Sequence, residues 1–329
     1  MKLNFMKNSG SSSEESSVPK KKVLSKQYFP VILLVVLCII FSIFSPRFLR
    51  ISNFLVVLQQ AIILLVAALG MTFIVIGGSI DLSVGSVVAL SAFVAATFSG
   101  TMGAAAIIPA SLVGLVCGVI NGVVFAKGKV PSFILTMGGM VAYRGLVLIL
   151  TKGAPVQIMN DSFLNVFTGK ILGIPNAILI TLVITILVYV IFNNLPFGRE
   201  IRSIGGGERV AIIAGIKVDK VKIIVFTLAG FLYGLTGVLQ SARALAATPT
   251  LGDGMEMDII ASVVVGGTPL TGGIGSIQGT ILGTLIITVL SNGMNMIGVT
   301  PEMQYIVKGA VLVLAVFATI DRSKIGIIK

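Results

Sequence analysis

Residues 76–86, IGGSIDLSVGS, place an aspartate between two strongly apolar stretches. An ionised carboxylate at membrane depth costs a few kcal/mol or more, so such residues usually line a polar pathway or bind a partner group. Two glycines precede Asp81, and another follows four residues after it. We therefore expect Asp81, with Ser79 and Ser83, to border a polar pathway or to brace its gate through backbone N–H groups and the Ser83 hydroxyl.

A second glycine-rich stretch, VVGGTPLTGGIGS at 264–276, repeats this pattern of apolar lead-in, glycine pair, polar stretch and small-residue exit. Irregular backbone survives near membrane depth only where protein or a water-filled cavity satisfies its polar groups. Paired interruptions in the two halves of a chain indicate a binding site or gate. Thr268 and Thr271 therefore join the candidate pathway residues. The alternative is that both stretches are tight turns on the cytoplasmic side.

The composition of the chain indicates a membrane protein. The chain has 329 residues, of which 56% are hydrophobic and 11% charged, and its mean hydropathy is +1.07. A membrane span takes about 20 apolar residues, whereas a barrel would show short alternating strands. We predict an all-α polytopic membrane protein of about ten transmembrane helices, near residues 29–45, 54–76, 84–100, 104–126, 133–150, 172–192, 223–242, 256–270, 277–298 and 302–320.

The basic residues predict the orientation. With ten spans and the N-terminus inside, the cytoplasmic segments hold 17 of the 24 Lys and Arg residues, and the outer loops hold five. This asymmetry places both termini in the cytoplasm, and it accounts for the net charge of +12 without a nucleic-acid surface. We expect one transmembrane domain, 29–320, between a disordered, basic and Ser-rich tail, 1–28, and a short cytoplasmic tail, 321–329.

Small residues at four-residue intervals indicate close helix packing. The stretch GSIQGTILG is expected to place Gly275, Gly279 and Gly283 on one helix face, and GVING and GFLYG repeat the interval once each. Small side chains at this spacing let helix backbones approach closely in lipid. We interpret all three stretches as packing surfaces of a tight bundle.

The longest charged cytoplasmic stretch is 193–222. Its centre, from Glu208 to Gly215, is expected to form a short helix with Val210 and Ile213 on one side. An apolar stripe on a cytosolic helix fits a groove on a partner protein, with Glu208 and Arg209 as rim charges; the alternative is a connector packed on the inner face of the bundle. The candidate docking residues are Gly206, Glu208, Arg209, Val210, Ile213 and Gly215.

The chain lacks the residue patterns of an enzyme. It contains no histidine, which is the commonest general base and metal ligand, and no G-x-x-x-x-G-K-[ST] or G-x-G-x-x-G motif for a nucleotide. Cys38 and Cys117 both lie in apolar runs and are interpreted as packing thiols. We predict no catalytic residue, no metal site and no cofactor, and the few ionisable residues within spans indicate that the energy source lies elsewhere.

Four long stretches closely resemble the ribose-type permeases of ABC sugar importers. They are GMTFIVIGGSIDLSVGSVVAL, KGKVPSFILTMGGMVAYRGL, GGGERVAIIAGIKVDKVKIIVFTLAG and ASVVVGGTPLTGGIGSIQGTILGTLIITVLSNGMNMIGV, and the resemblance runs from about residue 29 to residue 321. It implies a homodimeric, multi-pass permease in the bacterial inner membrane that carries ribose or a related monosaccharide inward.

The resemblance also implies partners. An extracytoplasmic sugar-binding protein would dock outside, and an ABC ATPase with tandem nucleotide-binding domains would bind ATP inside, near residues 205–217. The family often has Asn before the glutamate of this loop and Arg four residues after it, where this chain has Gly207 and Ile212. The alternative function is a stand-alone secondary carrier or facilitator for a small polar solute. A neighbouring gene for an ATPase with two P-loops would separate the two functions.

Overall fold

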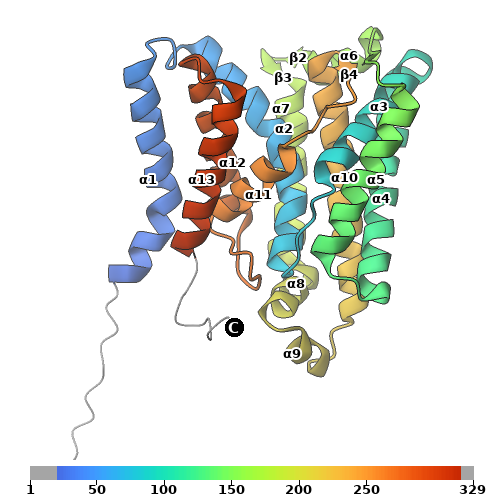
Figure 1. Ribbon diagram of the computed structural model, residues 1–329, viewed down its shortest axis with the longest axis vertical. Coiled ribbons are helices and arrows are strands. Elements are labelled where there is room, and N and C mark those ends of the chain that lie inside the picture. Colours follow the sequence, from blue (N-terminus) through green and yellow to red (C-terminus); the bar gives the residue numbers. More distant parts are fainter. Residues whose placement is uncertain (1–20, 320–329) are drawn as a thin grey trace, which may run out of the picture.

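The computed structural model describes residues 21–319, which fold almost entirely into helices (Figure 1). Two short antiparallel pairings join β1 to β4 and β2 to β3. The elements are α1 (Lys21–Phe44), α2 (Ile51–Ile76), α3 (Val84–Met102), η1 (Gly103–Ala106), α4 (Ile107–Gly128), α5 (Ser132–Thr151), β1 (Val156–Gln157), α6 (Asp161–Thr168), β2 (Lys170–Ile171), β3 (Ile174–Pro175), α7 (Asn176–Asn194), α8 (Pro196–Gly206), α9 (Glu208–Ile213), α10 (Val218–Ala244), β4 (Ala246–Ala247), α11 (Met255–Val265), α12 (Ile277–Met296) and α13 (Pro301–Thr319).

The long helices run between two ends of one bundle (Figure 1). The short helices α8 and α9 lie at one end, and the strands with α6 lie at the other. Within the described residues, six helical stretches are long and apolar enough to cross a membrane, one of them the combined stretch of α3, η1 and α4. The fold is therefore that of a polytopic helical membrane protein.

Two helices begin part-way through the bundle instead of at an end. α3 follows a non-helical segment, 77–83, that leaves α2, and α11 follows a non-helical segment, 245–254, that leaves α10. The two helices then run toward opposite ends (Figure 1). Their starts meet so closely that a Cβ on Gly85 would overlap the carbonyl oxygen of Gly252, and a Cβ on Gly252 would overlap that of Gly85. The helices α10 to α13 thus repeat the arrangement of α2 to α5, but each runs through the bundle in the opposite direction to its counterpart.

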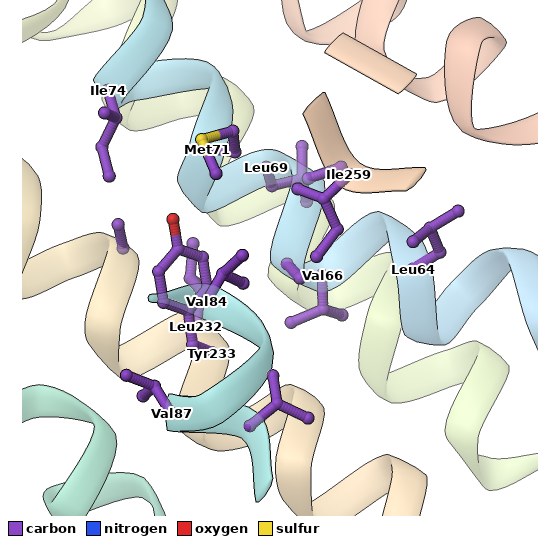
Figure 2. Close-up of a cluster of buried hydrophobic side chains, with 14 of the residues drawn as sticks. Leu64, Val66, Leu69, Met71, Ile74, Val84, Val87, Leu232, Tyr233 and Ile259 are labelled. Atoms are coloured by element: carbon purple, nitrogen blue, oxygen red, sulfur yellow. The ribbon is translucent and has the colours of Figure 1, made fainter. Parts of the chain in front are cut away.

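The core lies where α2, α3, α10 and α11 converge. Figure 2 shows α2 side chains such as Leu69 and Met71 close to Val84 of α3, Tyr233 of α10 and Ile259 of α11. All of these side chains are fully or almost fully buried. The same apolar cluster therefore anchors both α3 and α11, the two helices that begin part-way through the bundle.

Glycines set the spacing of the helices around this core. Gly114 and Gly118 of α4 lie against Gly230 and Gly234 of α10, with no room for a Cβ on either side. The GVING and GFLYG stretches thus pack near each other across one interface, as their spacing predicts. Backbones in direct contact bring more atoms into dispersion range than side chains would.

The third glycine stretch, GSIQGTILG, packs against α11 of the same chain. A Cβ on Gly279 would overlap the carbonyl oxygen of Gly266, and a Cβ on Gly283 would overlap that of Ser262. Gly275 is not on the helix, contrary to the expectation of one shared face. The helix begins only at Ile277, because the side chain of Ser276 caps it by accepting a hydrogen bond from the Gly279 N–H at 3.0 Å.

Several predicted boundaries also change. α1 begins at Lys21, so the last eight residues of the expected 1–28 tail are helical. α11 ends at Val265, short of residue 270, because Gly267 adopts a φ of +95° that stops the helix. α7 begins at Asn176 because residues 170–175 form the β2–β3 hairpin. Residues 1–20 of the expected tail, and the whole 321–329 tail, lie outside the described residues.

Replacing Gly279 with Leu is expected to destabilise the protein by about 1–3 kcal/mol, because the new side chain must displace the α11 backbone at Gly266. The measurement is the thermal unfolding midpoint of the purified permease in detergent.

Gly100→Leu provides the matched control, since a Cβ at Gly100 of α3 would meet no atom within 4 Å. The control should unfold close to the wild-type temperature. Equal midpoints for the two variants would contradict the close α11–α12 contact.

Candidate functional site

The Asp81 carboxylate is buried at the start of α3, with only 2% of the residue exposed. Its Oδ1 accepts hydrogen bonds from the Ser83 backbone N–H at 2.8 Å and from the Ser83 hydroxyl at 2.6 Å. Because α3 begins at Val84, the carboxylate lies at the positive end of the helix dipole, which stabilises a negative charge. Asp81 is therefore held by its own turn and the following helix.

The same serine connects Asp81 to two further helices. Asn121 of α4 donates a hydrogen bond from Nδ2 to the Ser83 Oγ at 2.9 Å. Tyr143 of α5 donates its hydroxyl hydrogen to the Asn121 Oδ1 at 3.0 Å. All four side chains are buried. They form one network, the Asp81 network, that joins the non-helical segment 77–83 to α4 and α5.

The backbone of the non-helical segment is satisfied by side chains from the first turns of α5. The Ile80 N–H donates to the Ser132 hydroxyl oxygen at 3.3 Å, and the Leu82 N–H donates to the Thr136 hydroxyl oxygen at 3.1 Å. Backbone N–H groups away from water must find such partners. The segment can thus remain non-helical inside the bundle because α5 supplies the hydrogen bonds.

The remaining candidate pathway residues occupy different surroundings. Ser79 is buried and borders a small, mostly apolar cavity with Ile74 and Phe226. Thr268 is fully buried, and its hydroxyl has no hydrogen-bond partner among the described residues. Thr271 is exposed in the loop between α11 and α12. The five predicted residues therefore do not line one cavity, and the geometry around Asp81 is that of a brace.

The two glycine-rich interruptions do meet, at the end of the bundle that carries α8. The Gly273 N–H donates a hydrogen bond to the Ile76 carbonyl oxygen at 2.8 Å. A Cβ on Gly272 would lie 2.7 Å from the Gly78 N and Cα, and one on Gly205 would overlap Ile76. We call this meeting of α2, α8 and the 266–276 loop the glycine junction. It is built from backbone contacts.

Below the junction, α8 packs on the bundle and α9 projects from it (Figure 1). Ile201 and Ile204 of α8 are buried, and the Arg202 guanidinium lies 4.2 Å from the centre of the Phe192 ring. These contacts fix α8 against the ends of α2 and α7, and so give α9 a rigid base.

The short helix α9 has the predicted start at Glu208, and Gly215 follows it with a φ of +81°. Only Ala211 of this helix is buried, whereas Val210, Ile212 and Ile213 are 70%, 56% and 86% exposed. The described residues therefore leave its apolar side chains uncovered, which favours the partner-groove interpretation over the packed connector. Sequence reasoning missed Ile212, although its apolar side chain was a visible signal.

Ion pairs connect α9 to α10 and α11 to α13. Glu208 pairs with Lys222 of α10 at 2.8 Å, and Arg209 is exposed. Within the bundle, Lys308 of α13 pairs with Asp258 of α11 at 2.8 Å. Asp258 lies inside the bundle because α11 starts part-way through it (Figure 1), after segment 245–254 folds back inward.

Comparison with known proteins now adds the family. A family model described as the permease component of the branched-chain amino acid transport system matches residues 53–316. The chain belongs to this permease family. A permease of this family is a membrane transport subunit, which agrees with the all-helical fold.

The chain is similar to several curated permeases over most of its length. It is 41% identical to the ribose import permease protein RbsC of Bacillus subtilis, over 90% of this chain and 92% of the relative. It is 39% identical to RbsC of Escherichia coli strain K12, over 89% and 93%. It is 32% identical to the xylose transport system permease protein XylH of Haemophilus influenzae, over 93% and 99%. No solved structure matches the chain.

Replacing Asp81 with Ala should destabilise the permease by about 1–3 kcal/mol, because the buried Ser83 N–H loses its acceptor. Solute uptake should fall while the variant still inserts in the membrane. Thermal unfolding in detergent and uptake by cells check the two effects.

Asp81→Asn is the matched control, since its amide oxygen can still accept the bond from the Ser83 N–H. It should retain more stability and uptake than Asp81→Ala. Wild-type uptake by the Asp81→Ala variant would show that the brace has no role in transport.

Proposed function

We propose that this chain is the membrane-spanning permease subunit of a bacterial ABC importer that moves ribose or a related monosaccharide into the cytoplasm. The observation that carries the proposal is the identity of about 40% with ribose import permeases, which extends over about nine tenths of both chains. The xylose permease relatives extend the candidate substrates to a second pentose. The chain has no nucleotide motif of its own, so ATP would be bound by a partner subunit.

The proposed topology has ten crossings with both termini in the cytoplasm. The six stretches of sufficient length and hydropathy supply seven crossings, because α3 and α4 are separate, oppositely directed helices (Figure 1). The other three crossings would be supplied by α1, by α13, and by α11 together with segment 245–254, which precedes it. The end with α8 and α9 would be cytoplasmic, since residues 193–222 carry six Lys and Arg residues.

The proposed ATPase contact is α9. Val210 and Ile213 are both exposed and lie three positions apart, so they form an anchor surface of the kind that enters a groove. Glu208 and Arg209 would be rim charges. Ala211 and the Glu208–Lys222 pair fix the helix to its own chain, so a movement of the ATPase would be transmitted through α8 to α2 and directly to α10.

Two further partners complete the proposed complex. A second copy of the chain would form the other half of the translocation pore, and an extracytoplasmic sugar-binding protein would deliver the sugar to the end formed by α6 and the β2–β3 hairpin. Both follow from the resemblance to ribose-type importers.

The decisive experiment is reconstitution of the permease in liposomes with the ATPase and binding protein encoded beside it. ATP hydrolysis should increase when ribose or xylose loads the binding protein, and labelled sugar should accumulate inside. Sugar accumulation without any ATPase would instead establish a stand-alone carrier. A complex that responds to branched-chain amino acids and to neither sugar would replace the substrate class.

Replacing Ile213 with Asp should abolish or strongly weaken ATPase association, because a charge would be buried in an apolar groove at a cost of several kcal/mol. The permease should still insert, since no membrane helix is altered. Co-purification of the ATPase with the variant, alongside sugar uptake, measures the effect.

Ile213→Val is the matched control, because it keeps an aliphatic side chain at the same exposed position. It should recover the ATPase at the wild-type level. Normal ATPase recovery with Ile213→Asp would mean that the ATPase docks elsewhere on the permease.

A further inference from the structure

An open cavity of about 460 Å³ lies on the outward face of α5, beside the start of α11. Its walls combine apolar side chains, among them Met140 and Val141, with three charged ones, Arg144, Asp253 and Glu256. Small-molecule sites typically have this volume and this mixture of apolar walls with a few polar groups. None of these residues belongs to the Asp81 network or to α9.

The cavity lies at membrane depth. α5 is 20 residues long, which is about 30 Å of helix, and Arg144 lies about 18 Å from its first residue. α11 begins part-way between the two ends of the bundle (Figure 1). The Glu256 carboxylate reaches the point where α3 and α11 meet, since a Cβ on Gly85 would lie 2.7 Å from its Oε2.

Arg144 has a structural task within this wall. Its Nη1 donates hydrogen bonds to the carbonyl oxygens of Pro249 and Leu251, at 2.8 Å and 2.9 Å. Its Nη2 pairs with the Asp253 Oδ1 at 2.6 Å. The guanidinium therefore holds the non-helical segment 245–254 in place and orients Asp253 toward the cavity.

The exposure of Asp253 distinguishes the Arg144–Asp253 pair from the Lys308–Asp258 pair of α13 and α11. The Asp253 side chain is 52% exposed, whereas both partners of the Lys308–Asp258 pair are only about one fifth exposed. A half-exposed carboxylate at this depth would be too costly against lipid, so it must face water or a polar solute. A face of α5 that met water at this point would form one wall of the translocation passage.

We propose that this cavity is a sugar subsite within the membrane, in which the carboxylates of Asp253 and Glu256 accept hydrogen bonds from the hydroxyl groups of a passing monosaccharide. Carboxylates are strong acceptors, and every sugar hydroxyl can donate. The apolar walls at Met140 and Val141 would contact the C–H faces of the ring. This inference rests on the proposed function and adds to it the residues that contact the substrate.

The first test is chemical labelling of the full permease in membranes, with Cys38 and Cys117 replaced by Ala. A Val141→Cys variant should react with a membrane-impermeant thiosulfonate reagent, and millimolar ribose in the complete transport complex should slow the reaction. Val141 is 65% exposed in the cavity wall, and Ile186 of α7, 53% exposed on another face, is the matched position. Ile186→Cys should not react. An unreactive Val141→Cys would overturn the proposal.

The second test is Asp253→Asn, which keeps the shape of the side chain and removes its charge. The sugar concentration needed for half-maximal uptake should rise about tenfold, as expected for loss of one strong hydrogen bond, and sugar should no longer slow labelling at position 141. Asp258→Asn breaks the Lys308–Asp258 pair outside the cavity, and it should lower thermal stability while sugar still protects position 141. Equal effects of the two variants on protection would overturn the subsite.

The outcomes separate this inference from the proposed function. If the wild-type complex takes up no sugar, the proposed function fails. If the wild-type complex takes up sugar but Val141→Cys is unreactive, only the subsite fails.

Discussion

Hydrocarbon offers no partner for a backbone N–H or C=O group, and the arrangement of this permease follows from that constraint. Two non-helical segments, 77–83 and 245–254, enter the bundle without the continuous hydrogen-bond ladder of a helix. Both are satisfied by α5: Ser132 and Thr136 accept from the first, and Arg144 donates to the second. A single helix therefore fixes the depth at which α3 and α11 begin.

The second constraint is contact between backbones. α4 meets α10, and α11 meets α12, at positions where no Cβ fits. The glycine junction extends the same principle to the end of the bundle that carries α8, where Ile76, Gly205 and Gly273 meet through main-chain atoms. A displacement of α8 would thus move α2 and the 266–276 loop directly, because the contacts are between main-chain atoms and not between flexible side chains.

Most of the helices could be predicted from the sequence, because the length of apolar runs and the spacing of glycines are local signals. Nine of the ten predicted spans correspond to helices of similar bounds, and α9 begins at the predicted Glu208. The eighth predicted span, 256–270, begins within one residue of α11 but runs five residues past its end at Val265. Nothing local in the sequence shows that residues 245–254 turn inward. The role of Arg144 was hidden for the same reason: its partners lie more than 100 positions away. The bracing of Asp81 by Ser83 was local and visible, whereas Asn121 and Tyr143 join it only through tertiary packing.

The exposed stripe of α9 has a consequence for the life of the protein in the cell. Exposed aliphatic side chains on a projecting helix are the kind of surface that chaperones and proteases recognise in unassembled subunits. With α9 as the proposed ATPase contact, a permease synthesised in excess of its ATPase would keep that surface uncovered and would be removed faster than one in a finished complex. The same few residues would then adjust the abundance of the permease to that of its motor, without any separate regulator.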